Sequence, residues 1–256
     1  MNLVPHFILQ KFAAGETHGR LPAVVFFVDL SGFTPLTAAL FQHQHDGAEV
    51  LSETLTQIFH PLVEAIYAWG GFISYFSGDA VTAVFPISTN AQEAASAAWQ
   101  TAVAVQHHLS PGGQPRLFAT RYGEFAIGAK AGLAAGELTW GIPGQENSYT
   151  YYFRGEAIDQ AIAVAAKDGT VELHPSLLAL AGWGTAVPEI TTTTPLRSPS
   201  VPHSLAAPIS HDMLRPFTAE AILEMPLQAD FRTIAPCFSP FKHHQIAQCC
   251  MNSSPK

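Results

Sequence analysis

The sequence predicts an α/β fold of the α+β kind, with a ferredoxin-like β-α-β-β-α-β sheet and helices on one face. Apolar runs of strand length alternate with longer stretches of helical periodicity, and glycine-containing turns separate them. At 256 residues, the chain has room for one domain of roughly 150–200 residues and an incomplete remainder.

The first strand is an apolar run over residues 23–29 that is rich in β-branched and aromatic side chains and ends at Asp29. Residues 31–35 then turn the chain. We expect Thr34 to be the N-cap of a short helix and Pro35 to take its first position, because hydroxyls suit the cap and proline needs no amide donor there.

A long helix is predicted over residues 46–69, where apolar side chains recur at helical spacing. Two β-rich runs follow, over residues 72–77 and 80–85. Gly78 and Asp79 separate them, and this pair suits a tight hairpin turn. Asp79 is therefore expected at a strand tip.

The second half of the domain continues the same alternation of strands and helices. Its predicted elements are a helix over 90–109, strands over 125–135, 137–142 and 149–153, and a helix over 155–167.

The chain is expected to divide into four parts. Residues 1–20 form a lead-in helix, 21–185 the domain, and 186–213 a linker rich in Thr, Ser and Pro. Residues 214–256 faintly repeat the start of the domain, because Pro216 and the stretch after it resemble residues 5–9 and 21–33.

Composition excludes several classes of protein. The apolar fraction is 48% and the charged fraction only 12%, so the surface should be poor in charge. A net charge of −8 with unclustered basic residues argues against a nucleic-acid partner. No apolar run reaches the roughly 20 residues of a transmembrane helix, and no secretory signal is visible, so we expect a cytoplasmic location.

Charge is unevenly distributed along the chain. No Lys or Arg occurs between Leu21 and Pro115, whereas seven acidic residues do. This part of the chain is expected to attract cations.

Asp29 and Asp79 are the candidate metal ligands. Both are expected at tips of neighbouring strands, where two carboxylates and the Leu30 carbonyl could bind Mg²⁺ together with phosphate oxygens. Each aspartate also has a plainer interpretation, as a cap or a hairpin residue. Polymerase palm domains and diguanylate cyclases could share this arrangement, although the Gly-Gly-Asp/Glu-Glu-Phe signature of the latter is missing.

A helix start beside the first aspartate offers a phosphate site. The backbone amides of Ser31, Gly32, Phe33 and Thr34 would point at an anion, and the helix dipole favours negative charge there.

Local motifs resemble the class III adenylyl and guanylyl cyclase catalytic domain over roughly residues 21–166. The motifs are FVDLSGFT at 27–34, Gly70-Gly71, Gly78-Asp79-Ala80, GLAAGE at 132–137 and YFRGEAID at 152–159. The pattern is most similar to the first cyclase domain of tandem proteins that resemble soluble adenylyl cyclase. The repeat after Pro216 then looks like the start of a second cyclase domain.

The resemblance implies conversion of ATP, with GTP less favoured, to a 3′,5′-cyclic monophosphate and pyrophosphate. Two Mg²⁺ or Mn²⁺ ions would be held by Asp29, Asp79 and the Leu30 carbonyl, and residues 31–34 would lie near the phosphates. Such sites form between two cyclase domains, so a complementary domain or a homodimer is the implied partner.

Three positions depart from the family pattern. Asp159 and Ala163 stand where the complementary half carries an Asn and a transition-state Arg, and Tyr75 stands where a Lys is common. Neither Asp nor Ala can meet developing phosphate charge. We therefore expect a homodimer to be weak or inactive. The alternatives are a catalytically degenerate regulatory module that binds nucleotide or a partner domain, and an incomplete gene product.

Overall fold

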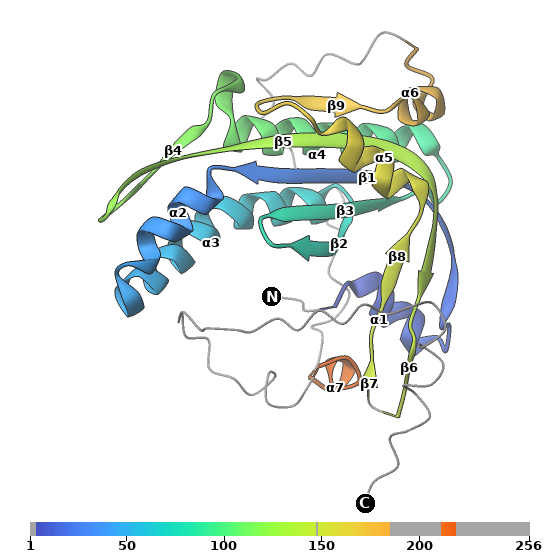
Figure 1. Ribbon diagram of the computed structural model, residues 1–256. Coiled ribbons are helices and arrows are strands. Elements are labelled where there is room, and N and C mark those ends of the chain that lie inside the picture. Colours follow the sequence, from blue (N-terminus) through green and yellow to red (C-terminus); the bar gives the residue numbers. More distant parts are fainter. Residues whose placement is uncertain (1–3, 147, 185–210, 219–256) are drawn as a thin grey trace, which may run out of the picture.

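The computed structural model describes residues 4–146, 148–184 and 211–218. Its centre is a mainly antiparallel sheet with the strand order β2-β3-β1-β5-β4, and β8 and β9 pair with further parts of β5. The two central strands are β1 (His18–Ser31) and β5 (Gly123–Gly141), which run side by side along the molecule (Figure 1). This confirms the predicted α+β class.

The remaining strands are short by comparison. Their bounds are Phe72–Ser77 for β2, Ala80–Pro86 for β3, Arg116–Thr120 for β4, Gly144–Gln145 for β6, Ser148–Tyr149 for β7, Tyr152–Arg154 for β8 and Val171–Leu173 for β9. The pairing of β9 with β5 is parallel, and β6 and β7 form a separate two-stranded ribbon.

The helices surround this sheet. They are α1 (His6–Ala13), α2 (Phe33–Phe41), α3 (Gln44–Ala68), α4 (Ala91–Leu109), α5 (Glu156–Val164), α6 (Pro175–Ala181) and α7 (His211–Leu214), with a single 3₁₀ turn at Pro111–Gly113.

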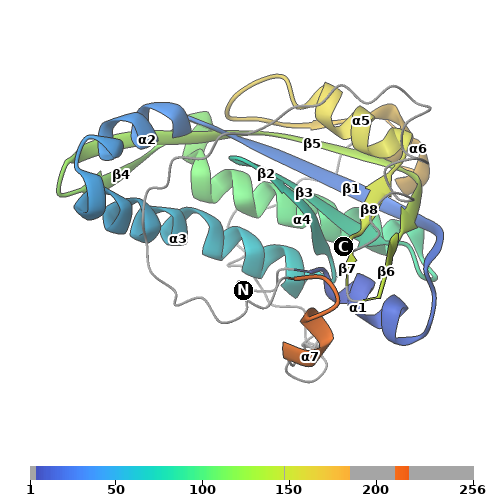
Figure 2. The same cartoon turned by 60° about the horizontal axis from the view of Figure 1, so that its bottom comes forward.

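Alternation along β1 divides the core into two clusters. Val24, Phe26 and Val28 are buried against α3 and α4, whereas Ala23 and Val25 are buried on the other face with residues of α1 and α5. Because successive side chains of a strand point to opposite faces, the sheet is covered on both sides. Helices were expected on one face. α1 and α5 add cover to the second, and Figure 2 shows α3 and α4 on one side of the sheet and α5 on the other.

Strand β5 is continuous where two strands were expected. The predicted break fell at Gly136, but this glycine and Gly132 provide room for α5 instead of a turn. A side chain at Gly132 would overlap the Ala161 carbonyl, and one at Gly136 would lie 3.2 Å from the Ala157 side chain. The helix therefore packs directly on the strand backbone, as expected of packing glycines.

Most other predicted elements are confirmed within a few residues. The long helix, the hairpin of β2 and β3, and α4 match the sequence interpretation, except that Asn90 is the N-cap of α4 and not its first residue. The last predicted helix ends earlier, at Val164, and the strand expected over 149–153 is split between β7 and β8. β4, β9 and α6 were not predicted.

Residues 211–218 pack against the N-terminal helix. Leu214 is buried, the Tyr149 amide donates to the Pro216 carbonyl at 2.8 Å, and the Phe217 ring lies 5.0 Å from that of Phe12. Most of the expected linker and the rest of the predicted second-domain start lie outside the described residues. The four-part division of the chain stays a prediction.

Candidate functional site

Strand register brings Asp29 and Asp79 to the same corner of the sheet. Asp29 lies near the end of β1 and pairs across the ladder with Ala80, the first residue of β3. Asp79 is the residue before Ala80, in the two-residue turn that joins β2 to β3. Because neighbouring strands lie about 4.8 Å apart, two aspartates fifty residues apart in sequence become close neighbours.

The turn owes its geometry to Gly78. This residue has φ of +65°, in the left-handed region, and a side chain there would meet nothing within 4 Å. Ser77 and Ala80 close the ladder directly on either side of the two-residue turn. The predicted hairpin, with Asp79 at its tip, is confirmed.

The backbone of Leu30 is oriented toward this hairpin. Its partner across the ladder, Ala129, donates its amide to Ser110 Oγ at 3.0 Å and accepts at its carbonyl from the Gly169 amide at 2.8 Å. These groups of Ala129 thus point away from β1. In an antiparallel ladder the residue opposite then directs its own amide and carbonyl to the other side, which here is the side of β3 and Asp79.

Lys130 occupies a place beside Asp29 that sequence reasoning missed. The two residues are directly paired across β1 and β5, and Lys130 Nζ lies 3.0 Å from Asp29 Oδ2. Their side chains are 36% and 26% exposed, so the ion pair is partly sheltered from water. Lys130 lies outside the segment 21–115 that lacks basic residues, and only the pairing of β1 with β5 brings it to Asp29.

Helix α2 starts immediately after β1 and leaves its first amides available. The helix begins at Phe33 with Gly32 as the N-cap, and none of the described side chains caps it. The expectation that Thr34 caps the helix and Pro35 begins it was wrong by two positions. Gly32 takes the cap because its φ is +87° and because a side chain there would overlap the Ala126 carbonyl. The amides of Phe33 and Thr34 thus stay free of side-chain caps.

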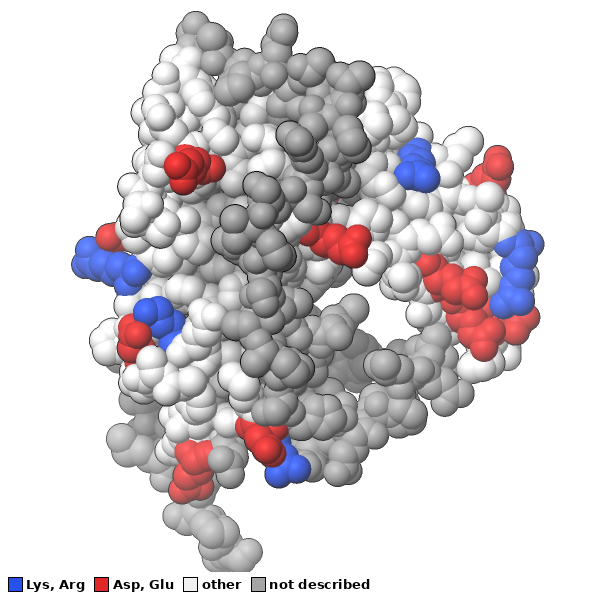
Figure 3. Space-filling view, turned by 180° about the vertical axis from the view of Figure 1, so that it is seen from behind, with Lys and Arg blue, Asp and Glu red and all other residues white. Residues whose placement is uncertain are grey.

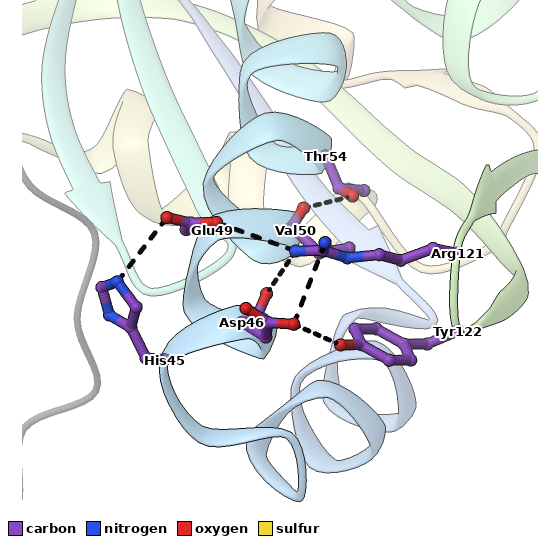
Figure 4. A network of polar contacts seen from close by, with 7 residues as sticks. All are labelled: His45, Asp46, Glu49, Val50, Thr54, Arg121 and Tyr122. Atoms are coloured by element: carbon purple, nitrogen blue, oxygen red, sulfur yellow. Dashed lines mark hydrogen bonds and ion pairs between the residues drawn. The ribbon is translucent and has the colours of Figure 1, made fainter.

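Acidic residues further along the chain serve a different purpose. Asp46 and Glu49 at the start of α3 face Arg121 in the turn between β4 and β5, with N···O distances of 3.9 and 3.7 Å, and Tyr122 donates to Asp46 at 3.2 Å. Figure 4 shows this network. These two carboxylates join α3 to the β4–β5 turn through Arg121, so a cation from the chain itself already lies beside them.

The candidate ligand set is small. The described residues contain no group of three or more His, Cys, Asp and Glu side chains that could hold a metal ion. Mg²⁺ is commonly bound through one or two carboxylates, with water and substrate phosphates completing its shell, so two aspartates and a carbonyl fit a metal that arrives with its substrate.

Comparison with known proteins identifies the fold. No protein-family model matches the chain. Human adenylate cyclase type 10 is 32% identical over 142 residues and its rabbit counterpart 31% over 140, in each case over 53% of this chain. The matched segment amounts to only 8% of either relative's length.

Two solved structures show the same architecture. The adenylyl cyclase CyaB from P. aeruginosa has a TM-score of 0.51 at 22% identity, covering 64% of this chain and 82% of that one. The dimeric guanylyl cyclase domain of the RhoGC fusion protein from the fungus Blastocladiella emersonii gives 0.51 at 22%, covering 65% and 86%. The chain contains a domain with the class III nucleotidyl cyclase fold. The resemblance inferred from its motifs is confirmed.

In this cyclase-fold domain, Tyr75 is held by the backbone of β8. Its hydroxyl accepts from the Phe153 amide at 2.6 Å, and its ring stacks on Tyr151 with centroids 6.3 Å apart. Burial raises the pKa of Tyr75, and the hydrogen bond with Phe153 opposes the shift. The phenol at this position thus joins β2 to β8 as a neutral group.

Asp159 and Ala163 lie on α5, which packs on β5. They stand one turn apart on α5, and both are exposed, whereas Ala157 and Ala161 are buried on the sheet. Because residues four apart share one helix face, both positions point away from the sheet.

The surface of this cyclase-fold domain agrees with its composition. Figure 3 shows one face on which charged side chains are sparse among uncharged ones. Within the described residues, no helix is both long and apolar enough to cross a membrane.

Proposed function

We propose that this domain is the metal-binding half of an adenylyl cyclase, which converts ATP to 3′,5′-cyclic AMP and pyrophosphate together with a complementary cyclase domain. The observation that carries the proposal is the meeting of Asp29 and Asp79 at one corner, next to the uncapped start of α2. The 31–32% identity to adenylate cyclase type 10 supports ATP as the substrate over GTP, whereas the fold is shared by adenylyl and guanylyl cyclases.

The residues at this corner fit a divalent cation. Asp29 already has a cationic partner in Lys130, and the Leu30 carbonyl is directed to the side of Asp79. We assign these two carboxylates and the carbonyl as ligands of Mg²⁺ or Mn²⁺, with two ions at the full site. When bound, such ions neutralise phosphate charge and lower the pKa of an attacking hydroxyl.

The chain's own groups would then bind and orient the triphosphate. The amides of Phe33 and Thr34 lie at the positive end of the helix dipole, next to the aspartate corner, and can donate to phosphate oxygens. Gly32 and Ser31 hold this helix start against β5, so the donors keep a fixed position relative to Asp29.

The complementary half must come from another domain. Transition-state charge needs a cation, and Asp159 and Ala163 supply none. Their exposed positions on α5 support the proposal that a homodimer of this chain is weak or inactive.

A regulatory module without its own turnover is the second candidate. It is favoured by Tyr75, whose hydroxyl is engaged with Phe153 at the position where the family resemblance implies a lysine. Such a module would bind nucleotide or a partner domain through the same corner, and Asp29→Asn would then change binding without changing any chemical step.

One experiment separates the two candidates. Cyclic AMP formation from ATP and Mn²⁺ is measured for the purified chain, for a complementary domain that carries Asn, Arg and Lys but no metal aspartates, and for their mixture. We expect activity in the mixture alone, lost with Asp29→Asn or Asp79→Asn. A silent mixture of domains that demonstrably associate would favour the regulatory module. GTP in place of ATP tests the substrate assignment in the same assay.

A further inference from the structure

We infer that Lys130 is an internal counter-cation that holds Asp29 while the site lacks metal, and that a divalent ion must displace it. The inference rests on the proposed metal-binding function and adds a coupling to it. Metal alone should bind weakly, and metal with a triphosphate should bind much more tightly, because the displaced ammonium then has a new anionic partner.

The position of Lys130 is fixed by backbone contacts on both sides. It faces Asp29 across the ladder, and the neighbouring residues on β5 are tied to other elements: Ala129 to Ser110 and Gly169, and Ala131 through its amide to the Thr170 carbonyl at 3.2 Å. The backbone therefore cannot move away from β1. Only the flexible side chain can leave Asp29 when another cation arrives.

The ion pair differs from the second ion pair between the same two strands. Arg20 and Glu137 also contact at 2.9 Å, but their side chains are 76% and 51% exposed, against 36% and 26% for Lys130 and Asp29. Exposed ion pairs contribute little because water and salt screen them. The more sheltered pair at the site should retain more of its attraction and so compete measurably with a metal ion.

Lys130 and a divalent ion compete because both would contact the same carboxylate, that of Asp29. An ammonium 3.0 Å from Asp29 Oδ2 and a divalent cation bound to the same group would repel each other strongly at this distance. Binding of metal thus includes the loss of the Lys130 contact. A triphosphate restores the balance, since its oxygens accept hydrogen bonds from the ammonium as readily as a carboxylate does.

The test measures two affinities that should change in opposite directions. Binding of Mn²⁺ alone is followed by electron paramagnetic resonance, and binding of a non-hydrolysable ATP analogue is followed at saturating Mn²⁺. For Lys130→Met we expect Mn²⁺ alone to bind about fivefold tighter, the ratio for an ion pair worth about 1 kcal/mol, and the nucleotide analogue to bind at least about fivefold more weakly.

Arg20→Met is the matched control, because it removes a cation from the other ion pair of β1 and β5 and should change neither affinity. A merely structural role for Lys130 would weaken both affinities together, and unchanged or weaker Mn²⁺ binding in Lys130→Met would overturn the inference.

Asp29→Asn in the wild-type background separates this failure from that of the proposed function. If Asp29→Asn leaves Mn²⁺ binding unchanged, the metal site itself is wrongly assigned. If it removes Mn²⁺ binding while Lys130→Met has no effect, only the coupling is wrong.

Discussion

Two regions of this cyclase-fold domain differ in which chemical groups they present. At the corner of β1, α2 and the β2–β3 turn, two carboxylates, a directed carbonyl and free helix amides converge. On α5 and in the middle of β2, Asp159, Ala163 and Tyr75 supply no cation, and the tyrosine hydroxyl is occupied by the backbone of β8. This difference is what we expect if the domain supplies one half of a shared site, as proposed above.

The largest expected effect is at the first region. Asp79→Ala should lower the activity of this domain mixed with its complementary cyclase domain by at least about 100-fold, because the variant lacks one of the two carboxylates proposed to bind metal. Circular dichroism should be unchanged, since Asp79 lies in a turn whose backbone depends on Gly78. The control Asp46→Ala removes a carboxylate bound to Arg121 and should leave activity within about threefold of wild type.

A gain of function tests the second region. Ala163→Arg combined with Asp159→Asn should give the chain alone measurable cyclic AMP formation with Mn²⁺, because both positions are exposed and accept larger side chains without disturbing the core. We expect turnover well below that of the mixed domains, since Tyr75 still replaces a lysine. Silence of the double variant, with dimer formation shown by ultracentrifugation, would mean that Tyr75 is the decisive departure.

The helix start at the first region also depends on one glycine. Gly32→Ala should destabilise the domain by about 2–4 kcal/mol, because it adds both the strain of φ +87° and overlap with the Ala126 carbonyl. Gly78→Ala is the matched control, with positive φ but open space around the new methyl group, and should cost only about 1 kcal/mol. Urea unfolding of both variants measures the difference. Equal losses of stability in the two variants would show that the contact between Gly32 and Ala126 does not fix the start of α2.

Much of the fold and of the aspartate corner could be predicted from the sequence, because these features depend on local patterns. Hydrophobic periodicity predicted α3, and an alanine-rich stretch predicted α4. The Gly78-Asp79 pair predicted the hairpin, since a two-residue turn needs residues that tolerate positive φ. The aspartate pair followed from placing both residues at strand tips.

The features that the sequence did not predict depend on strand register and on contacts between distant parts of the chain. Lys130 is fifteen residues beyond the end of the segment that lacks basic residues, and only the pairing of β1 with β5 brings it to Asp29. The sequence left open whether Gly136 is a packing or a hairpin glycine, and two strands were predicted on either side of it. Contact with α5 makes it a packing glycine within one strand, and local sequence does not reveal which element packs over a glycine. The cap of α2 was misplaced for the same reason, since contact with Ala126 selects Gly32 over Thr34.

Tyr75 offers a smaller test, of stability at the second region. Tyr75→Phe removes the hydroxyl that accepts from the Phe153 amide and should cost about 1–2 kcal/mol, the usual cost of leaving a buried donor unsatisfied. Tyr151→Phe keeps the stacked ring and leaves that hydrogen bond in place, so it should cost less. Thermal unfolding of the two variants measures the contrast. A larger loss in Tyr151→Phe would contradict the assignment of this hydrogen bond as the link between β2 and β8.

The smallest expected effect lies outside both regions, at His108 on α4. Arg116 Nη1 lies 3.1 Å from its Nδ1 and the Gln57 carbonyl 3.2 Å from its Nε2, so the neutral imidazole accepts from the guanidinium and donates to the carbonyl. Burial lowers the pKa of His108, the charges of Arg116 and His107 lower it further, and the contact with Gln57 opposes them.

The lowered pKa of His108 determines how the stability of the domain changes with pH. In the unfolded chain His108 takes up a proton near pH 6.5, whereas the folded domain resists it to lower pH, so stability falls as the pH drops below about 6.5. Solvent around the half-exposed ring keeps the effect small, about one or two degrees in melting temperature between pH 7 and pH 5.5. His108→Gln should remove this part of the pH dependence. A wild-type domain that became more stable over the same interval would show that the imidazole is protonated in the fold, and that Arg116 cannot be its partner.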